Sequence, residues 1–455
     1  MVKELLHHDE APIVALASGQ GPSAIALLRV SGRGCHDKLL SCLRKKSLRS
    51  WNMNHQSLCQ LFYPETSVVL DEVMVTLFRA PYSYTGQDAA EVFLHGSPYI
   101  VQAALKLFYK LGFRHAEPGE FTRRAYLSGK IDLSEAEGIH DLISSYSEQQ
   151  WFAARQLYSG KLKNLVDQIS QQLIEAIAWL EASIDFPEED DTSRIHGSDI
   201  KSRVQKVECT LEDLLATYSN GKVATEGLRV AFFGEPNVGK STLMNTLLNS
   251  ERAIVTDIPG TTRDYLEETC LINGRLIRLI DTAGIRESSE TIEQMGIQRT
   301  YEIAKKADLV LFLSDHADNE KVKLWLDEIG CTQYLKVHTK SDLSFSGNVS
   351  SDWIKISCHR EIGIDDLKEK IQSTIDSYLK PLAESTFISS LRHKTAVEQS
   401  LESIHRFYMA IEEKAYDEIL AFELHQAMKE LRSIVGEISS DQILDKIFST
   451  FCVGK

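Results

Sequence analysis

The sequence predicts a multidomain α/β protein in which a helical domain is interrupted by an inserted, mostly parallel α/β domain. Three observations predict this class. Residues 11–115 mix strand and helix patterns, residues 119–218 and the stretch after Pro381 have helical periodicity, and short apolar runs alternate with helical segments between these two stretches. The length of 455 residues suits about three domains.

The composition excludes several classes of protein. The chain has 50 Lys plus Arg against 65 Asp plus Glu, a formal net charge of −15, which argues against wholesale nonspecific binding to nucleic acid but leaves a local basic face open. No apolar run approaches the ~20 residues that cross a bilayer, and residues 1–12 do not have the pattern of a secretory signal. The eight cysteines show no C-x-x-C pair and no zinc-ligand spacing. We therefore expect reduced thiols in a cytoplasmic protein without a membrane partner.

Residues 1–120 form the first predicted domain, of the α+β class. Apolar runs at 25–30 and 73–78 are bounded by Gly, Pro and Ser turns, which is typical of strands. Residues 101–111 have helical spacing.

Residues 121–222 and 380–455 are predicted to be two parts of one helical domain. Between residues 157 and 180, apolar side chains recur largely at steps of three and four, as in an amphipathic helix. Pro187 and the acidic run 185–191 end that helix, and we expect the run to be a solvated loop before a second helical stretch.

Residues 223–379 form the predicted inserted domain. Its apolar runs, each typical of a buried parallel strand, are residues 228–233, 276–280, 309–313, 335–337 and 353–356. Asn273 and Gly274 lie between residues 270–272 and the second of these runs. This pair predicts a hairpin, so one strand pair should be antiparallel.

A phosphate-binding loop opens the inserted domain. Residues 234–241 match G-x-x-x-x-G-K-[ST] between a predicted strand and a helix, so backbone N–H groups and the helix N-terminus can hold phosphate oxygens. We expect Lys240 to reach the β- and γ-phosphates and Ser241 to bind Mg²⁺. The context predicts a Ras-like P-loop domain.

Four further segments follow this loop in the order typical of GTPases. Residues 260–264 are placed where a switch loop puts a Thr on the metal, and residues 281–284 offer a carboxylate to the Mg²⁺ shell and an N–H to the γ-phosphate. Asp342, within 339–342, can accept from guanine N1 and N2, which favours GTP over ATP. Residues 357–359 are expected under the base.

Two positions depart from the common GTPase pattern. Thr339 replaces the usual Asn of the guanine motif; it lacks the amide that contacts guanine N7 and ties this loop to the phosphate loop, so we expect reduced affinity, offset in part by its hydroxyl. Ile285 follows Gly284 and cannot orient a water molecule, so another group must supply the chemistry. Glu293 is a candidate base or water anchor, with a solvated switch-region carboxylate as the alternative.

Eight short segments carry a resemblance to a known family. They are residues 28–32, 84–88, 118–122, 130–133, 184–187, 234–241, 256–264 and 452–455. Together they resemble the MnmE (TrmE) family of tRNA modification GTPases, and the resemblance covers the whole chain. The final Cys-Val-Gly-Lys is the most specific segment, with Val453 where Ile is more usual.

The resemblance implies that the N-terminal domain dimerises and binds 5,10-methylene- or 5-formyl-tetrahydrofolate as a one-carbon donor. The family's folate contacts fall on Arg29, Glu91, Lys130 and Lys455, although each taken singly could be a surface charge. It also implies a homodimer that works with the flavoprotein MnmG (GidA) in a heterotetramer or larger complex. FAD and NADH belong to that partner. The implied product is an aminomethyl or carboxymethylaminomethyl group at C5 of the wobble uridine (U34) of certain tRNAs.

The resemblance further implies K⁺-dependent GTP hydrolysis. The matching K⁺ ligands are Asn237, Thr256, Ile258 and Thr261, while Thr262 joins Ser241 on Mg²⁺ and Glu293 matches the water-positioning carboxylate. The residues expected to bind GTP are Asn237, Val238, Gly239, Lys240, Ser241, Thr242, Thr256, Asp257, Ile258, Pro259, Gly260, Thr261, Thr262, Asp281, Thr282, Ala283, Gly284, Thr339, Lys340, Asp342, Ser357, Cys358 and His359.

Cys452 matches the family's essential cysteine, and three roles stay open for it. Its thiolate could take part in the uridine chemistry, it could shape the folate site, or it could be a buried structural thiol. For the whole protein, the alternative is a regulatory GTPase switch that binds RNA or assists ribosome assembly without modification chemistry. The terminal residues 452–455 and the folate set favour modification. A scaffold with vestigial GTPase activity is disfavoured because the phosphate and metal residues are present.

Overall fold

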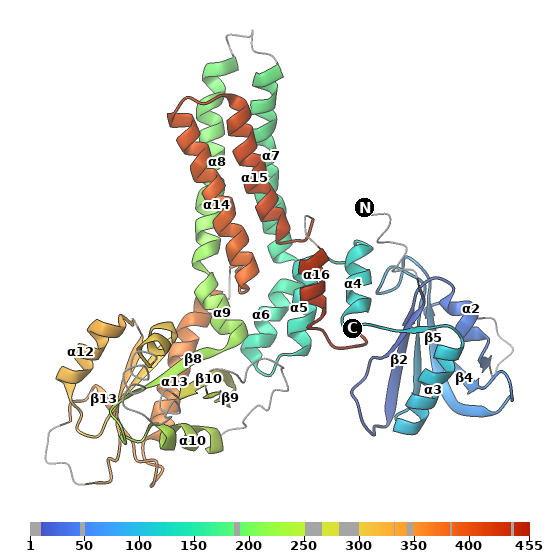
Figure 1. Cartoon of the computed structure of the whole chain (residues 1–455), viewed down its shortest axis with the longest axis horizontal. Helices are drawn as coiled ribbons and strands as arrows, with labels where there is room; N and C mark the ends of the chain where they lie inside the picture. Colours follow the sequence, from blue (N-terminus) through green and yellow to red (C-terminus); the bar gives the residue numbers. More distant parts are fainter. Residues whose placement is uncertain are drawn as a thin grey trace, which may run out of the picture. The chain divides into compact units, whose positions relative to one another are not determined.

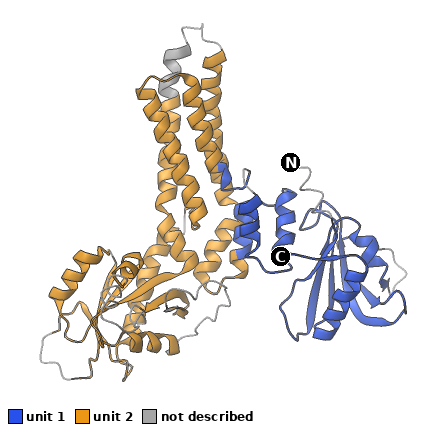
Figure 2. Ribbon diagram, in the orientation of Figure 1, with its two compact units in different colours: residues 1–140, 432–455 blue, residues 141–431 orange. Residues whose placement is uncertain are grey.

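The structure is a computed structural model that describes residues 11–45, 51–185, 192–250, 266–281, 300–331, 333–343, 349–382, 385–437 and 441–455. It divides into two compact units, one made of Met1–His140 with Arg432–Lys455 and one of Asp141–Leu431 (Figure 2). The first unit therefore combines segments far apart in the sequence. Among the described helices, none is long and apolar enough to cross a membrane.

A seven-stranded sheet forms the centre of the first unit (Figure 1). Its strands are β1 (Ile13–Leu16), β2 (Ile25–Ser31), β3 (Leu43–Lys45), β4 (Ser57–Phe62), β5 (Val69–Phe78), β6 (Ala89–His95) and β7 (Arg114–His115). Their order is β3-β4-β5-β6-β2-β1-β7, and all neighbours are antiparallel except β1 and β7. Alternate residues of β5, among them Val73 and Val75, are buried in the core, as expected for a sheet with one covered face.

Among the described residues, five helices belong wholly or largely to the first unit. They are α2 (Cys35–Leu40), α3 (Pro98–Lys110), α4 (Glu120–Leu127), α5 (Leu133–Ile143) and α16 (Asp441–Phe448). Leu107 and Phe108 of α3 pack into the core of the sheet. Leu133 of α5 packs with Leu444 and Phe448 of α16 in a separate apolar cluster. This cluster joins the late segment of the chain to the early one.

Helices dominate the first part and the end of the second unit. They are α6 (Glu148–Tyr158), α7 (Lys161–Asp185), α8 (Thr192–Ala216), α9 (Tyr218–Glu226), α14 (Leu391–Glu412) and α15 (Asp417–Ser433). Figure 1 shows the four long helices α7, α8, α14 and α15 side by side. Ser183 Oγ donates to Asp417 Oδ2 at 2.5 Å and so joins α7 to α15. The predicted turn through Pro187 lies outside the described residues.

A six-stranded sheet forms the α/β part of the second unit. Its elements are β8 (Leu228–Gly234), α10 (Lys240–Ser250), β9 (Leu266–Ile272), β10 (Arg275–Asp281), β11 (Leu309–Ser314), α12 (Asn319–Ile329), β12 (Tyr334–His338), β13 (Trp353–Lys355), α13 (Ile364–Leu379) and the 3₁₀ turn η1 (Lys380–Leu382). The strand order is β13-β12-β11-β8-β10-β9. Among the described strands of this sheet, β9 and β10 alone pair antiparallel, through the turn at Asn273 and Gly274. The predicted hairpin and the α/β segment inserted between helices are confirmed.

Candidate functional site

The phosphate loop connects β8 to α10 in the way that the sequence predicts. Gly234 has φ 156°, and a Cβ added there would lie 2.4 Å from the main-chain oxygen of Leu313. Only glycine therefore lets β8 approach β11 this closely. Asn237 and Gly239 also have positive φ, 62° and 102°. The loop runs directly into the first turn of α10. The backbone N–H groups at this helix N-terminus can bind an anion.

Two predicted phosphate and metal groups have defined partners in this loop. The Lys240 ammonium donates to the carbonyls of Gly234 and Glu235, each at 2.8 Å. Ser241 Oγ donates to Asp281 Oδ2 at 3.1 Å, which places a hydroxyl from α10 beside a buried carboxylate from β10. Both are hard oxygen donors of the kind that Mg²⁺ prefers, so these residues fit the expected metal.

The guanine motif contacts the phosphate loop directly. Thr339 is 3% exposed, its Oγ1 donates to the carbonyl of Val238 at 2.7 Å, and its N–H donates to the carbonyl of Ser314 at 3.0 Å. The hydroxyl of Thr339 therefore links the two loops in place of the usual amide, which agrees with the expected partial substitution, while the reduced affinity for GTP stays a prediction. This hydrogen bond does not replace the contact that an asparagine amide would make with guanine N7.

The carboxylate expected to recognise guanine is held by a serine from the next predicted segment. Ser357 Oγ donates to Asp342 Oδ1 at 2.6 Å, and this hydrogen bond lowers the pKa of Asp342. The side chain is therefore an anion at neutral pH and can accept hydrogen bonds. Lys340 pairs with Asp315 at 3.0 Å, while Cys358 is half-buried beside the core and His359 is exposed.

Part of the predicted nucleotide site lies outside the described residues. Described are Asn237, Val238, Gly239, Lys240, Ser241, Thr242, Asp281, Thr339, Lys340, Asp342, Ser357, Cys358 and His359. Outside them lie Thr256, Asp257, Ile258, Pro259, Gly260, Thr261, Thr262, Thr282, Ala283, Gly284, Ile285 and Glu293. Of the four expected K⁺ ligands, Asn237 alone is therefore described.

A second cluster of predicted residues lies in the first unit. Arg29 of β2 and Glu91 of β6 are cross-strand partners, and the guanidinium donates to Glu91 Oε1 through Nε at 3.2 Å and Nη2 at 2.8 Å. Arg29 Nη1 also donates to the main-chain oxygen of Gly454 at 3.3 Å. The C-terminal tail, residues 452–455, thus lies against two of the expected folate contacts.

Backbone hydrogen bonds hold the tail at the start of α4. The Gly119 N–H donates to the Cys452 carbonyl at 3.4 Å, and the Phe121 N–H donates to the Lys455 oxygen at 3.2 Å. Gly454 has φ 95°, and a Cβ on it would lie 2.4 Å from the Leu16 oxygen. Glycine is therefore required here, and the tail fits closely between β1 and α4.

The side chains of the tail differ in environment. Burial, and then the charge of Arg29, lower the pKa of the Lys455 ammonium. Cys452 is exposed, so it is not the buried structural thiol that was one of its three open roles. Cys452 stands two positions before Gly454, so an exposed thiol-bearing residue lies next to the closely fitted part of the tail.

Lys130 contacts a loop that also lies against Arg29. Its ammonium donates to the Pro81 carbonyl at 3.1 Å. The loop that carries Pro81 also carries Tyr84, whose ring centre lies 5.7 Å from the Arg29 guanidinium carbon and whose OH is 3.0 Å from Thr122 Oγ1. Arg29, Glu91 and Lys455, three of the four predicted folate residues, therefore lie close enough for their charges to interact. The fourth, Lys130, hydrogen-bonds the neighbouring loop.

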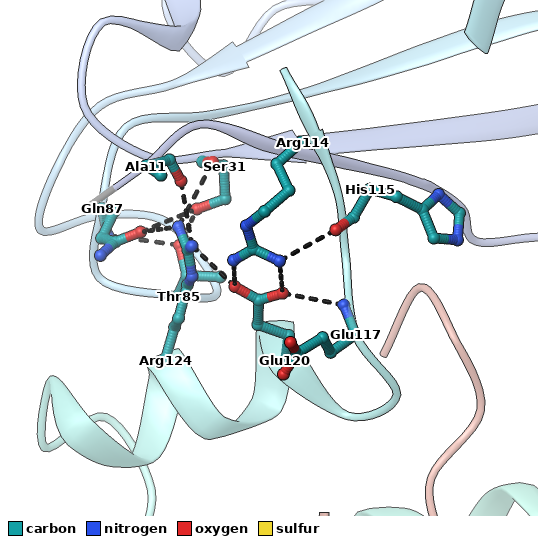
Figure 3. A network of polar contacts seen from close by, with 9 residues as sticks. All are labelled: Ala11, Ser31, Thr85, Gln87, Arg114, His115, Glu117, Glu120 and Arg124. Atoms are coloured by element: carbon teal, nitrogen blue, oxygen red, sulfur yellow. Dashed lines mark hydrogen bonds and ion pairs between the residues drawn. The ribbon is translucent and has the colours of Figure 1, made fainter. Parts of the chain in front are cut away.

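Sequence reasoning missed a buried polar network around the first turn of α4 in the same unit (Figure 3). Arg124 Nη1 donates to Gln87 Oε1 at 2.9 Å, and its Nη2 donates to Glu120 Oε1 at 2.8 Å. Arg114 donates to the same carboxylate, at 3.0 and 2.5 Å. Burial raises the pKa of the Glu120 carboxyl, but Arg114 and Arg124 outweigh burial and hold that pKa below its usual value. The spacing of Glu120 and Arg124, four residues apart on a short helix, is the signal that could have found the pair.

Comparisons with known proteins agree along the whole chain. The family model of the MnmE helical domain matches residues 133–452, and the model of the GTP-binding protein TrmE N-terminus matches residues 12–130. The tRNA modification GTPase MnmE of Aquifex aeolicus is 39% identical over 453 residues, covering 98% of this chain and 99% of its own. The protein of the same name from Akkermansia muciniphila is 38% identical over 452 residues, covering 98% and 99%.

Among solved structures, the FeoB G-domain from Methanococcus jannaschii is 28% identical and covers 33% of this chain and 98% of its own, with a TM-score of 0.25. The match of the helical-domain model over more than half of the chain, together with full-length relatives above one-third identity, decides the family. The chain belongs to the MnmE family of tRNA modification GTPases.

Proposed function

We propose that this protein hydrolyses GTP to GDP and phosphate and that this hydrolysis controls the modification of wobble uridines in tRNA. In the hydrolytic site, Ser241 and Thr262 hold Mg²⁺. K⁺ is held by Asn237, Thr256, Ile258 and Thr261. Glu293 orients the attacking water, a task that Ile285 cannot perform.

The phosphate loop is prepared for this role by its own contacts. Lys240 donates to two loop carbonyls, and when a nucleotide binds, its ammonium turns to the β- and γ-phosphate oxygens, which are better acceptors because they are charged. Ser241 and Asp281 are already in contact, and a hydroxyl beside a carboxylate supports the proposed Mg²⁺ site because both are hard oxygen donors.

Guanine selection falls to Asp342 and Thr339. The lowered pKa of Asp342 keeps its carboxylate ionised, so it accepts from guanine N1–H and N2–H, which adenine cannot match. Thr339 keeps the base loop and the phosphate loop at a fixed separation through Val238. Binding of the base and binding of the phosphates are thereby coupled.

The first unit is proposed to bind a tetrahydrofolate, which supplies a one-carbon unit when bound. Arg29 and Lys455 are cations suited to the glutamate tail or carbonyl groups, and Glu91 can accept from the amino groups of the pterin. Lys130 adds a further cation. Cys452 is the proposed catalytic thiol for the uridine chemistry. The flavoprotein MnmG (GidA), carrying FAD and using NADH, is the proposed partner of a homodimer of this chain.

The observation that carries this proposal is the position of residues 452–455 against Arg29 and the start of α4. A pure GTPase switch that binds RNA or assists ribosome assembly has no use for a close-fitting cysteine-bearing tail beside paired charges. A catalytic site for one-carbon chemistry does, because it needs a thiol and ligand-binding charges within one small region.

The decisive experiment is mass spectrometry of wobble uridines in cells that lack this protein. The proposal expects the C5-substituted uridines to disappear and to return when the wild-type gene is restored. Unchanged wobble uridines, together with a defect in ribosome assembly, would support the switch instead.

A further inference from the structure

One face of α6 exposes aromatic and cationic side chains that the proposed sites do not use. Trp151 is 45% exposed and Tyr158 is 50% exposed, and Arg155 between them is also exposed. Lys161, the first residue of α7, follows three positions after Tyr158 in the sequence and is exposed as well. We call Trp151, Arg155, Tyr158 and Lys161 the α6 stripe.

The opposite face of α6 is anchored, so the stripe is presented on a fixed support. Ala153, Ala154 and Leu157 are buried. Gln149 Nε2 donates to the carbonyl of Val223 at 3.2 Å, and Gln150 Nε2 donates to that of Thr225 at 2.9 Å. Both bonds attach α6 to α9, and Figure 1 shows the two helices as neighbours.

Aromatic rings and positively charged side chains alternate along the α6 stripe. The Arg155 guanidinium carbon lies 5.3 Å from the centre of the Trp151 ring system. Positions 151, 155 and 158 share one face of a helix. With a rise of about 1.5 Å per residue, the backbone positions of Trp151 and Tyr158 are about 10 Å apart, so each ring can receive a separate base.

The cations of this region are not neutralised by any carboxylate among the described residues. Within the described part of the chain, no carboxylate pairs with Arg155, Lys161 or Lys163, although the chain carries a net charge of −15. Elsewhere on the helices arginines are paired: Arg203 contacts Glu175 at 2.5 Å and Arg406 contacts Glu423 at 2.9 Å.

The nearest acidic residue in sequence to the stripe is already engaged. Glu148, at the start of α6, faces Arg275 at 3.7 Å. Asp167 lies further along α7 and is exposed. The stripe cations are therefore available to an anion from outside.

We propose that the α6 stripe binds a single-stranded segment of the RNA substrate, with bases stacking on Trp151 and Tyr158 and phosphates contacting Arg155 and Lys161. Alternation of aromatic rings and unpaired cations is how proteins bind single-stranded RNA. Protein interfaces are also enriched in Trp, Tyr and Arg, but they are depleted of Lys, so the neighbouring Lys161 and Lys163 favour RNA. The inference rests on the proposed function, from which the tRNA substrate comes.

The test measures the affinity of the full-length protein for a fluorescein-labelled, unmodified tRNA transcript by anisotropy, at several salt concentrations. Trp151→Leu keeps apolar bulk but removes the π face, so affinity should fall about tenfold. Trp151→Phe keeps a π face and should stay close to wild type. Arg155→Gln should make the slope of log affinity against log salt shallower by about one.

Matched controls come from the same helical region. Trp179 of α7 is 47% exposed, and Arg203 of α8 is paired, so Trp179→Leu and Arg203→Gln should leave tRNA affinity unchanged. GTP turnover and thermal unfolding of the stripe variants should match wild type, which separates lost contact from lost folding.

Three results overturn the inference. If wild type binds tRNA and Trp151→Leu binds it equally, the stripe assignment fails and the proposed function stands. If the stripe variants keep tRNA affinity but lose the flavoprotein, the stripe is a protein contact. If wild type binds no tRNA, the inference and its basis fail together.

Discussion

The hydroxyl of Thr339 donates to the main-chain carbonyl of Val238 at 2.7 Å, which joins the loop proposed to recognise guanine to the loop proposed to hold phosphate. Thr339 is almost fully buried, so no water can replace this bond without rearrangement. The two loops come from different strands, and this bond is a direct side-chain link between them.

The first prediction concerns this bond. Thr339→Val keeps the shape but leaves the Val238 carbonyl without its donor, so GTP affinity should fall about five- to tenfold, corresponding to ~1 kcal/mol. Thr339→Ser, which keeps a hydroxyl, should lose little. Calorimetric titration with a non-hydrolysable GTP analogue measures both. Equal affinity of the valine variant and wild type would show that the tie is unimportant for binding.

The second prediction concerns the monovalent cation. GTP turnover should be much faster in K⁺ than in Na⁺, and Asn237→Ala should abolish the difference because it removes the amide oxygen proposed as a ligand. Asn237 has φ 62°, so alanine also adds backbone strain. Asn237→Gly removes the ligand without that strain and is the matched control. The proposed K⁺ site is refuted if wild type turns over equally in the two salts.

The third prediction concerns Cys452. Its side chain is exposed and its carbonyl, not its sulfur, accepts the hydrogen bond from Gly119. Cys452→Ser should therefore leave folding, GTP hydrolysis and folate binding near wild type, because the tail keeps its backbone contacts. Wobble-uridine modification should be lost, because a serine hydroxyl is a far weaker nucleophile than a thiolate.

The assay for this variant is modification of transcribed tRNA with the flavin partner, methylene-tetrahydrofolate, NADH, GTP and K⁺. Full activity of Cys452→Ser argues against a chemical role for the sulfur. Loss of folate binding in the variant would instead make Cys452 a structural part of the folate pocket.

The fourth prediction concerns Gly454. A Cβ at this position meets the Leu16 oxygen at 2.4 Å, and φ is 95°, so Gly454→Ala should push the tail away from β1 and break the contact with Arg29. Folate binding should weaken at least tenfold, by the loss of more than ~1.4 kcal/mol of positioning contacts, while GTP turnover persists. Val453→Ala, at an exposed position, is the control. Tryptophan-independent readouts such as calorimetry are preferred for folate, which absorbs strongly.

The fifth prediction concerns Glu120. Removing its charge leaves Arg124, which is buried, without its carboxylate partner, so Glu120→Gln should destabilise the first unit by about 3 kcal/mol. The folded-state pKa of Glu120 is lowered, so the stability that ionisation contributes is present above the unfolded pKa of about 4.3. It is lost as pH falls through the folded pKa.

The difference between wild type and Glu120→Gln should therefore be full at pH 7 and shrink in acid. Urea unfolding at a series of pH values measures it. Arg114→Gln, which changes the more exposed of the two guanidinium partners, should cost less than Glu120→Gln. A difference that stays constant down to pH 3 would contradict the assignment of this stability to the carboxylate.

Local patterns in the sequence predicted those features of the fold that depend on residues close together in the chain. The hairpin at Asn273 and Gly274 and the loop from Gly234 to Ser241 are set by turn chemistry and strand-to-helix spacing, and both are present. The contact of Arg29 with Gly454 is different, because it joins residues 425 positions apart. Family resemblance placed both residues in or near one site, whereas periodicity and composition gave no sign of it.

Two further features could not be predicted in their geometry, for a physical reason. The bond from Thr339 to Val238 depends on where two loops meet above the sheet, and a residue-type rule that compares threonine with asparagine cannot include that distance. The Arg124 network needs acceptors from β2, the following loops and α4 at once. Burying a guanidinium is favourable only when such acceptors are in place, and the sequence alone does not reveal them.

The first unit is completed by a segment that the ribosome makes only after the whole second unit. Leu133 and Ala136 of α5 are covered by Leu444 and Phe448 of α16, so during translation this apolar surface stays open while residues 141–431 are synthesised. A truncated chain that ends before residue 432 therefore leaves this apolar surface exposed to solvent. Exposed apolar surface of this kind is recognised by chaperones and proteases. The same segment carries Cys452, so a chain that lacks it would both expose this apolar surface and lack the proposed catalytic thiol.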